Sequence, residues 1–180
     1  MKNIVKLTTP LDPNRIETLR CGDFVEITGT IYTARDAAHK RMKEMLEKNM
    51  SLPFDLSGQI IYYAGPCPAK PGQVIGSIGP TTSGRMDVYT PLLLKQGLAG
   101  MIGKGKRSQE VIDAMIRYKS VYFGATGGAG ALISKCVKKA EVIAFDDLGT
   151  EAIRRLYVED LPVIVLIDCK GNKLYKEFDK

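Results

Sequence analysis

The sequence predicts an α/β fold in which residues 1–180 form a single domain with a mixed or parallel sheet. Three observations predict it. Residues 24–33 alternate in polarity and are rich in β-branched side chains, which favours a strand. Residues 34–48 are dense in Ala, Met, Leu, Glu, Lys and Arg and lack Gly and Pro, which favours a helix. From residue 86 onward helical and strand patterns alternate, as in parallel strands joined by helical crossovers.

The other elements follow from local composition in chain order. In the first half, short apolar segments bounded by Gly and Pro predict strands at residues 3–8, 59–63 and 73–78. In the second half, we expect four helices, each followed by a strand: 86–96 and 98–102, 108–118 and 121–123, 129–136 and 141–145, 151–157 and 163–167. Pro91 is expected to kink or split the first of these helices. A last short strand is expected after the turn Lys170-Gly171-Asn172.

The composition favours a globular protein that binds a small anion. Apolar residues make up 44% of the chain and charged residues 26%, and the net charge is +6. The Lys and Arg residues are interleaved with Asp and Glu, and no basic run is paired with aromatic residues, so we expect no nucleic acid partner. No stretch approaches the ~20 apolar residues that span a bilayer. The first residues carry no long apolar run, so we also expect no signal peptide and a cytoplasmic location.

Cysteine and histidine usage narrows the chemistry. The four cysteines, Cys21, Cys67, Cys136 and Cys169, form no Cys-x-x-Cys pair and no local iron–sulfur pattern. We expect four reduced thiols and no metal site built wholly from this chain. His39 is the single histidine, which leaves little room for transition-metal sites or a Ser-His-Asp triad.

The segment Gly79-Pro80-Thr81-Thr82-Ser83-Gly84-Arg85-Met86-Asp87 is the strongest candidate site. It joins a predicted strand to a predicted helix, and helix N-termini favour anions through their free amides and dipole. Thr81, Thr82 and Ser83 add hydroxyl groups, and Arg85 can hold a carboxylate through two parallel hydrogen bonds. Plain N-capping needs only one hydroxyl. The three consecutive hydroxyls followed by Arg therefore predict an anion site.

A second candidate, Lys104, leaves the carboxyl end of a predicted parallel strand, where α/β sheets bind ligands. The surrounding Gly103-Lys104-Gly105-Lys106-Arg107-Ser108 is not a phosphate loop, because Arg107 stands where Ser or Thr is required. Apart from Lys104, we interpret this segment as a solvated basic turn in which Ser108 caps the next helix. If its loop neighbours the threonine segment, Lys104 and Arg85 can share one ligand.

Arg35 and His39 form a third candidate pair. They lie four residues apart on the predicted helix and therefore share a face. Arg35, at the helix start, is a candidate for a second carboxylate, whereas Asp36 suits the helix dipole in any case. A lone helical histidine is more often structural, but the shared face makes a functional role an equal alternative. The glycine-rich segment 124–130 lacks the Gly-x-Gly-x-x-Gly pattern and indicates close backbone approach to a ligand or a subunit.

Together these segments resemble the beta subunit of the iron–sulfur-dependent class I fumarate hydratases and the related tartrate dehydratase beta subunit. The resemblance covers nearly the whole chain in order. It is carried by Arg35-Asp36-x-x-His39, the 79–87 segment, Lys104-Gly105-Lys106-Arg107-Ser108, Gly127-Gly128, and residues 148–153 and 158–162. It implies the swivelling β/β/α domain. It also implies that a partner alpha subunit, and not this chain, carries a four-iron–four-sulfur cluster with one open iron.

The resemblance further implies roles for single residues. Thr81 would be the base that takes the carbon-bound proton, and His39 would assist catalysis or orient Arg35. Arg35, Arg85, Lys104 and Thr82 would bind the two carboxylates of the substrate. The expected reaction interconverts (S)-malate and fumarate plus water in a hetero-oligomer, with self-association through the beta subunit as a further option. Tartrate dehydration is the first alternative, and a stand-alone anion- or nucleic-acid-binding module is the second.

Overall fold

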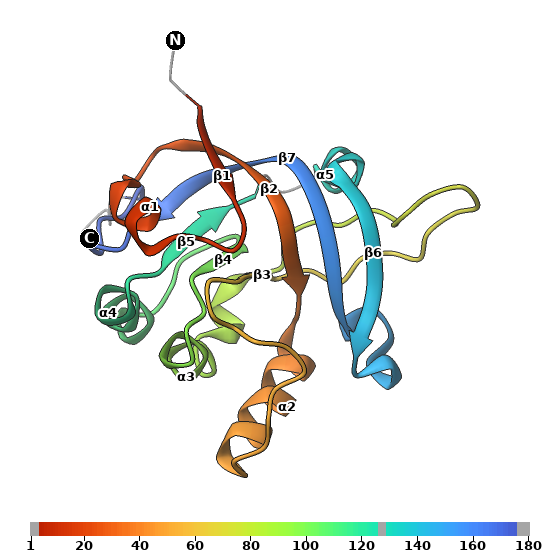
Figure 1. The fold of residues 1–180 in the computed structure, drawn as a ribbon, viewed down its shortest axis with the longest axis horizontal. Coiled ribbons are helices and arrows are strands. Elements are labelled where there is room, and N and C mark those ends of the chain that lie inside the picture. Colours follow the sequence, from red (N-terminus) through yellow and green to blue (C-terminus); the bar gives the residue numbers. More distant parts are fainter. Residues whose placement is uncertain (1–3, 126–128, 176–180) are drawn as a thin grey trace, which may run out of the picture.

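The centre of the molecule is a closed barrel of five strands, seen in a computed structural model that describes residues 4–125 and 129–175 (Figure 1). Four of the strands run parallel to one another in chain order, and the fifth is antiparallel to both of its neighbours. They are β2 (Phe24–Thr33), β3 (Ile60–Tyr62), β4 (Gly100–Gly103), β5 (Val121–Gly124) and β7 (Ile153–Ile167). The fold is therefore a mixed α/β fold, and the predicted mixed sheet is confirmed.

The long strand β7 closes the barrel, because it pairs with β2 on one side and with β5 on the other. Two further strands extend the sheet: β1 (Val5–Thr8) lies parallel to the first half of β2, and β6 (Val137–Ala144) lies antiparallel to β7. Strand β2 shifts register between Ile27 and Gly29. The first half of β2 pairs with β1 and its last residues pair with β3. The irregularity lies where β2 changes from one neighbouring strand to the other.

Side chains of alternating strand residues fill two apolar layers. One layer lies inside the barrel and holds Ile60, Val163 and Val165. The other holds Ile61 and Leu166, and it lies between the barrel and the helices that cover its outer face. These helices are α2 (Asp36–Glu47), α3 (Thr90–Lys95) and α4 (Gln109–Tyr118) (Figure 1). The period-two alternation of a strand thus separates the two layers.

The remaining elements cap the barrel and join its strands. Helix α1 (Pro13–Thr18) was not predicted, although Asp12 accepts a hydrogen bond from the amide of Asn14 as its N-cap and Pro13 occupies its first turn. Helix α5 (Gly130–Cys136) packs on the inner layer through Ile133. Two short 3₁₀ helices, η1 (Ser83–Met86) and η2 (Asp146–Glu151), complete the fold. Among the described residues, no helix has the length and apolar character that crossing a membrane requires.

Two predicted elements are wrong, and the last short strand predicted after residues 170–172 is, within the described residues, a single bridge between Lys173 and Ile167. Residues 151–157 were predicted as a helix, but from Ile153 onward they form the first part of β7. Their high helix propensity is overridden because β2 and β6 pair with this segment from both sides. Residues 73–78, predicted as a strand, form an irregular segment whose Ile75 and Ile78 are buried in the barrel core. Their apolar spacing marks burial at the barrel end and not pairing in the sheet.

The predicted helix at residues 86–96 divides, as the position of Pro91 indicates. Helix η1 ends at Met86, and α3 begins at Thr90 with Pro91 in its first turn. Proline is tolerated there because the first amides of a helix have no intrahelical acceptor. The division matters for the site, because residues 83–89 are not held within one continuous α-helix.

Glycine should be required at position 29, where β2 shifts its register with β7. Its φ is +124°, and a Cβ atom built there would lie 2.3 Å from Thr9 Oγ1 and 3.1 Å from Thr9 N. We expect Gly29→Ala to lower the free energy of unfolding by about 2–3 kcal/mol, measured by urea unfolding. Gly72→Ala is the matched control, because Gly72 also has a positive φ but meets nothing within 4 Å. Equal losses in the two variants would contradict the steric argument.

Candidate active site

The loops that follow β2, β3 and β4 gather at one edge of the barrel, because these parallel strands end on the same side. Arg35 follows β2, Gly65 follows β3, and Lys104 follows β4. The threonine segment lies at this edge as well. All six predicted site residues therefore belong to, or border, one rim of the molecule.

The threonine segment continues the sheet beyond the ends of β3 and β4. The amide of Thr81 donates to the carbonyl of Tyr63 at 2.7 Å, and Thr82 forms a parallel bridge with Lys104. The amide of Ser83 donates to the carbonyl of Lys104 at 2.9 Å. The two predicted loops are thus neighbours. Thr82 and Lys104 are exposed, and Thr81 is half-buried.

Ser83 lies at the junction of the two loops and is fully buried. Its Oγ accepts a hydrogen bond from the amide of Lys104 at 3.1 Å and is bonded to the hydroxyl of Tyr122 at 2.8 Å. A Cβ atom at Gly103 would lie only 2.0 Å from Ser83 Oγ. Glycine at position 103 is therefore what allows the threonine segment to approach β4 so closely.

Arg85 is held at the start of α2. Its Nε and Nη2 donate to Asp36 Oδ1 and Oδ2 at 3.0 and 3.2 Å, a bidentate contact. Asp36 is the first residue of α2, and Arg35 is the N-cap residue before it. This ion pair spans 49 positions of sequence and places Arg85 beside Asp36, the residue that follows Arg35.

Arg35 is wedged between the end of β3 and the loop before β7. A Cβ atom at Gly65 would lie 2.9 Å from Arg35 Nη1 and 3.0 Å from the carbonyl oxygen of Thr150. The Nε of Arg35 lies 3.9 Å from Glu151 Oε1, and it is buried without a hydrogen-bond partner among the described residues. This guanidinium retains capacity to bind an acceptor.

His39 lies beneath this rim and is fully buried. Its Nδ1 is 2.7 Å from the carbonyl oxygen of Arg35, so Nδ1 carries the proton and donates. Its Nε2 has no hydrogen-bond partner in the described part of the chain, and the ring packs edge-on against Tyr63. Burial lowers the pKa of His39 to about 4, and the nearby Arg107 acts in the same direction. The imidazole is neutral, and its contact with Arg35 supports the start of α2.

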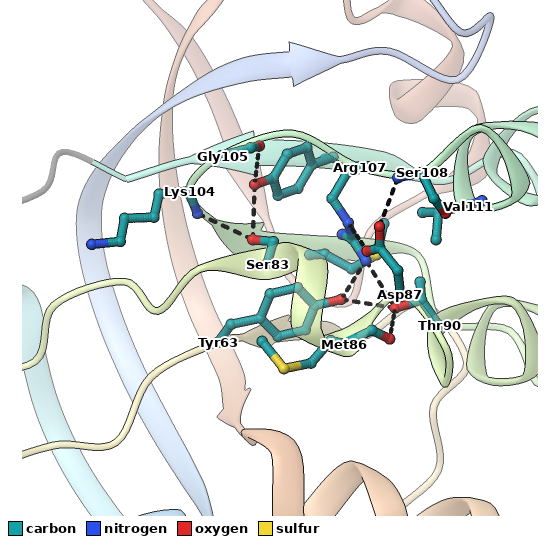
Figure 2. A network of polar contacts seen from close by, with 12 residues as sticks. Tyr63, Ser83, Met86, Asp87, Thr90, Lys104, Gly105, Arg107, Ser108 and Val111 are labelled. Carbon is teal, nitrogen blue, oxygen red and sulfur yellow. Dashed lines mark hydrogen bonds and ion pairs between the residues drawn. The ribbon is translucent and has the colours of Figure 1, made fainter.

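The interpretation of residues 103–108 as a solvated turn is wrong for Arg107. The Arg107 side chain is 0% exposed, and its Nε donates to Asp87 Oδ1 at 2.6 Å (Figure 2). Burial alone would lower its pKa, but Tyr63 and Asp87 hold the pKa above its ordinary value. Ser108 caps α4 as predicted, accepting from the amide of Val111. The opposite charges of Asp87 and Arg107 were the only sequence signal, and a separation of 20 positions hid it.

The rim has the groups needed to hold a small dianion. It presents three cationic side chains, Arg35, Arg85 and Lys104, and the hydroxyls of Thr81 and Thr82. The exposed fractions of the Arg35 and Arg85 side chains are 29% and 51%, so both remain accessible to a ligand. Lys104 extends away from the buried contacts around Arg107 (Figure 2). Cations placed in this way neutralise and orient two carboxylates.

The part of this chain that the structure describes does not offer a ligand set for an iron–sulfur cluster. Within residues 4–125 and 129–175, no three His, Cys, Asp or Glu residues gather in a metal-binding group. The four cysteines are free: Cys136 is the last residue of α5, and the other three lie in three different connecting segments. Gly127 and Gly128 lie outside the described residues. Gly130 closely approaches its own chain, because a Cβ atom there would meet Ser77 Oγ at 2.5 Å and the amide nitrogen of Gly79 at 3.1 Å.

Residues 1–178 match the protein family described as "Fumarase C-terminus". The chain belongs to this family. It is 41% identical over 155 residues to the anaerobic class I fumarate hydratase of Escherichia coli K12, covering 85% of this chain and 28% of that protein. It is 38% identical over 177 residues to fumarate hydratase 2 of Leishmania major, covering 96% of this chain and 31% of that protein.

A third relative is named as a subunit of another dehydratase, and its length is close to that of this chain. The chain is 42% identical over 171 residues to "Putative L(+)-tartrate dehydratase subunit beta" of Methanocaldococcus jannaschii, covering 92% of this chain and 88% of that protein. The fumarase C-terminus domain described here thus has hydro-lyases as homologues. It spans less than a third of each of the two fumarate hydratases and most of the separate subunit.

The buried His39 predicts a pH dependence of stability. Its folded-state pKa of about 4 lies below the ordinary value of 6.5, so the unfolded chain binds the proton first as the pH falls. The contribution of His39 is therefore complete above pH 6.5 and declines toward pH 4. Between pH 7.5 and pH 5, the stability of the wild type relative to His39→Asn should fall by about 2 kcal/mol. Urea unfolding at both pH values measures this difference, and a constant difference would contradict a neutral buried imidazole.

Proposed function

We propose that this chain is the beta subunit of a cytoplasmic class I fumarate hydratase, which interconverts (S)-malate and fumarate plus water. The observation that carries the proposal is the convergence of Thr81, Thr82, Arg85 and Lys104 on the rim that Arg35 borders. The similarity to two fumarate hydratases over at least 85% of the chain supports it. The exposure of these cations suits a site that a partner subunit completes.

In this proposal the cationic rim binds the substrate by its two carboxylates. Arg35 and Arg85 lie at the start of α2, and Lys104 lies across the threonine segment from them. Arg85 contacts Asp36 in a geometry that a substrate carboxylate can also adopt. Thr82 adds a hydroxyl beside Lys104. Two fixed carboxylates determine which carbon of the substrate faces Thr81.

Thr81 is proposed to take the proton from the carbon next to one carboxylate. Removing this proton places negative charge on the carboxylate oxygens, and the arginines and Lys104 stabilise that charge. The same cations favour the deprotonated form of the Thr81 hydroxyl, which is otherwise a poor base. The hydrogen bond from the Thr81 amide to Tyr63 fixes the residue in place. His39, buried against the carbonyl of Arg35, is proposed to act by orienting Arg35.

The partner in this proposal is an iron–sulfur alpha subunit, which carries the four-iron–four-sulfur cluster and supplies the general acid for the leaving hydroxide. The described residues of this chain offer no comparable ligand set. We therefore assign to this chain substrate binding and proton abstraction alone. A hetero-oligomer is consistent with a relative of similar length that is named as a subunit. We further propose that the barrel and its helices correspond to the swivelling β/β/α domain, with residues 1–180 as one domain.

Tartrate dehydration is the second candidate function. The similarity to the tartrate dehydratase beta subunit is the observation that favours it, since 88% of that protein is covered. Both reactions remove a hydroxyl from a hydroxylated four-carbon dicarboxylate, and the cationic rim suits both substrates. The additional hydroxyl of tartrate would have to find a partner at the site.

Reconstitution tests the proposed function directly. The chain mixed anaerobically with its iron–sulfur alpha subunit should form fumarate from malate, measured by the absorbance of fumarate. The chain alone should have no measurable activity. Turnover of tartrate but not malate would select the second candidate. Activity on neither substrate, combined with salt-dependent binding of RNA or DNA, would favour a nucleic-acid-binding module.

Thr81→Ala should lower kcat of the reconstituted enzyme by ~10²–10⁴-fold, because a positioned base is lost. The backbone contacts of residue 81 with Tyr63 persist in this variant, so the fold should be retained. Thr18→Ala, at an exposed threonine of α1, serves as the control. Steady-state kinetics and circular dichroism give the two readouts. Near-normal kcat in a folded Thr81→Ala enzyme would refute the assignment of Thr81.

Arg85→Lys should lower kcat/KM by about 10–100-fold, because lysine keeps the charge but loses the bidentate contact. The exposed Arg117→Lys on α4 is the matched control and should be neutral. Kinetics with varied malate separates the two cases. If Arg85→Lys behaves like the control, Arg85 does not hold a carboxylate.

A further inference from the structure

Arg107 is a buried cation that contacts Met101 on the preceding strand and several segments distant in the sequence. Besides Asp87, its Nη2 donates to Thr90 Oγ1 at 2.8 Å and to the hydroxyl of Tyr63 at 3.3 Å (Figure 2). Its guanidinium carbon lies 5.3 Å from the ring centre of Tyr63 and 4.9 Å from that of Tyr122. A charge enclosed in this way is held in one position by directional contacts.

These contacts join the threonine segment, residues 79–87, to the lysine loop, residues 104–108. Asp87 follows η1 directly, and its second oxygen accepts from the amide of Ser108 at 2.6 Å. Asp87 therefore binds the segment that follows Lys104 at two points, through Arg107 and through Ser108. At the start of η1, Ser83 accepts from the amide of Lys104. The threonine segment and the lysine loop are therefore joined at the first residue of η1 and again just after its last.

Tyr122 connects the two junctions. Its hydroxyl is hydrogen-bonded to Ser83 Oγ at 2.8 Å and to the carbonyl of Gly105 at 3.0 Å. Its ring faces Arg107. Burial raises the pKa of Tyr122 to about 12, so the phenol keeps its proton. The order of the rim thus depends on one continuous set of buried polar contacts.

Stability alone does not account for a buried ion pair. Removing two charges from water costs so much that apolar replacements of both partners are often as stable as the pair. The contacts of Arg107 and Asp87 are, however, directional, and they end on the residues that flank Lys104 and η1. Their geometric role is therefore the stronger explanation of why this pair is buried here.

We propose that Arg107 and Asp87 are positioning residues, which hold the threonine segment against the lysine loop so that Thr82, Lys104 and Arg85 face one ligand. The inference rests on the proposed function for the identity of that ligand. Neither residue contacts the substrate. Both act by fixing, before the ligand arrives, the separation of side chains that bind it.

The test replaces both charges at once with apolar side chains of similar size, in the double variant Asp87→Leu/Arg107→Met. Its urea midpoint should stay within ~0.5 M of the wild type, because no unpaired charge remains. Its kcat/KM for malate in the enzyme reconstituted with the alpha subunit should fall ~10–100-fold per folded molecule. The exposed pair of α1 and α4, replaced as Glu17→Gln/Lys119→Met, is the matched control and should keep wild-type kinetics.

A readout on the chain alone keeps the inference separate from the proposed function. Amide hydrogen exchange by NMR reports the hydrogen bonds of Ser83 N and Lys104 N, and both amides should exchange at least ~10-fold faster in the double variant. The small change Ser83→Ala should have the same effect on Lys104 N, because that amide loses its acceptor. If the wild-type chain mixed with its alpha subunit turned over neither malate nor tartrate, the proposed function would be refuted. The exchange results would still be interpretable.

Two results would overturn the positioning role. One is wild-type kinetics in a folded double variant, which would reduce the ion pair to a structural feature. The other is unchanged exchange at Ser83 and Lys104 in both the double variant and Ser83→Ala. If the double variant does not fold, Ser83→Ala decides alone: unchanged exchange and unchanged kcat/KM would refute the proposal.

Discussion

The ion pair between Arg107 and Asp87 is the interaction on which the rest of the site depends. Arg107 enters the protein interior from the loop after β4, and Asp87 meets it from the end of η1. A buried charge must be compensated by partners of fixed geometry, so the two loops are fixed relative to each other. The bridge between Thr82 and Lys104 and the hydrogen bond from Lys104 to Ser83 join the same two segments a few residues before these anchor points. The buried contacts of Arg107, Asp87 and Ser83 hold the two loops of the rim together.

The barrel supplies the frame for this arrangement. Its four parallel strands end at one edge, and β7 closes the sheet without placing a crossover there. Two layers of apolar side chains then fix the barrel from inside and the helices from outside. The loops at the edge carry polar groups: Arg85 and Lys104 are exposed and Arg35 is half-buried, whereas Arg107 is buried. The exposed cations meet the substrate in the proposed function, whereas the buried one orders them.

The start of α2 shows the same division between contact and support. Arg35 reaches the rim, and Asp36 holds Arg85 in a bidentate contact. His39, one turn further along, binds the carbonyl of Arg35 from below while remaining neutral. One helical turn therefore contributes the cation that binds a carboxylate in the proposed function, the residue that holds Arg85, and a buried support. Such a turn is compact in sequence, which is why Arg35 and His39 could be singled out before the structure was known.

The sequence by itself determined the elements with strong local signals, namely β2, α2, α4 and the division of the 86–96 helix at Pro91, together with the segments that carry Thr81, Arg35 and Lys104. Local periodicity and turn residues suffice for these because the signal, a burial pattern or a helix-breaking residue, lies within the segment itself. Only the tertiary structure decided that residues 153–157 belong to β7, that the barrel closes, that Arg85 pairs with Asp36, and that Arg107 is buried against Asp87. Each of these depends on contacts between residues far apart in the chain, and such contacts override local propensity without leaving a local pattern.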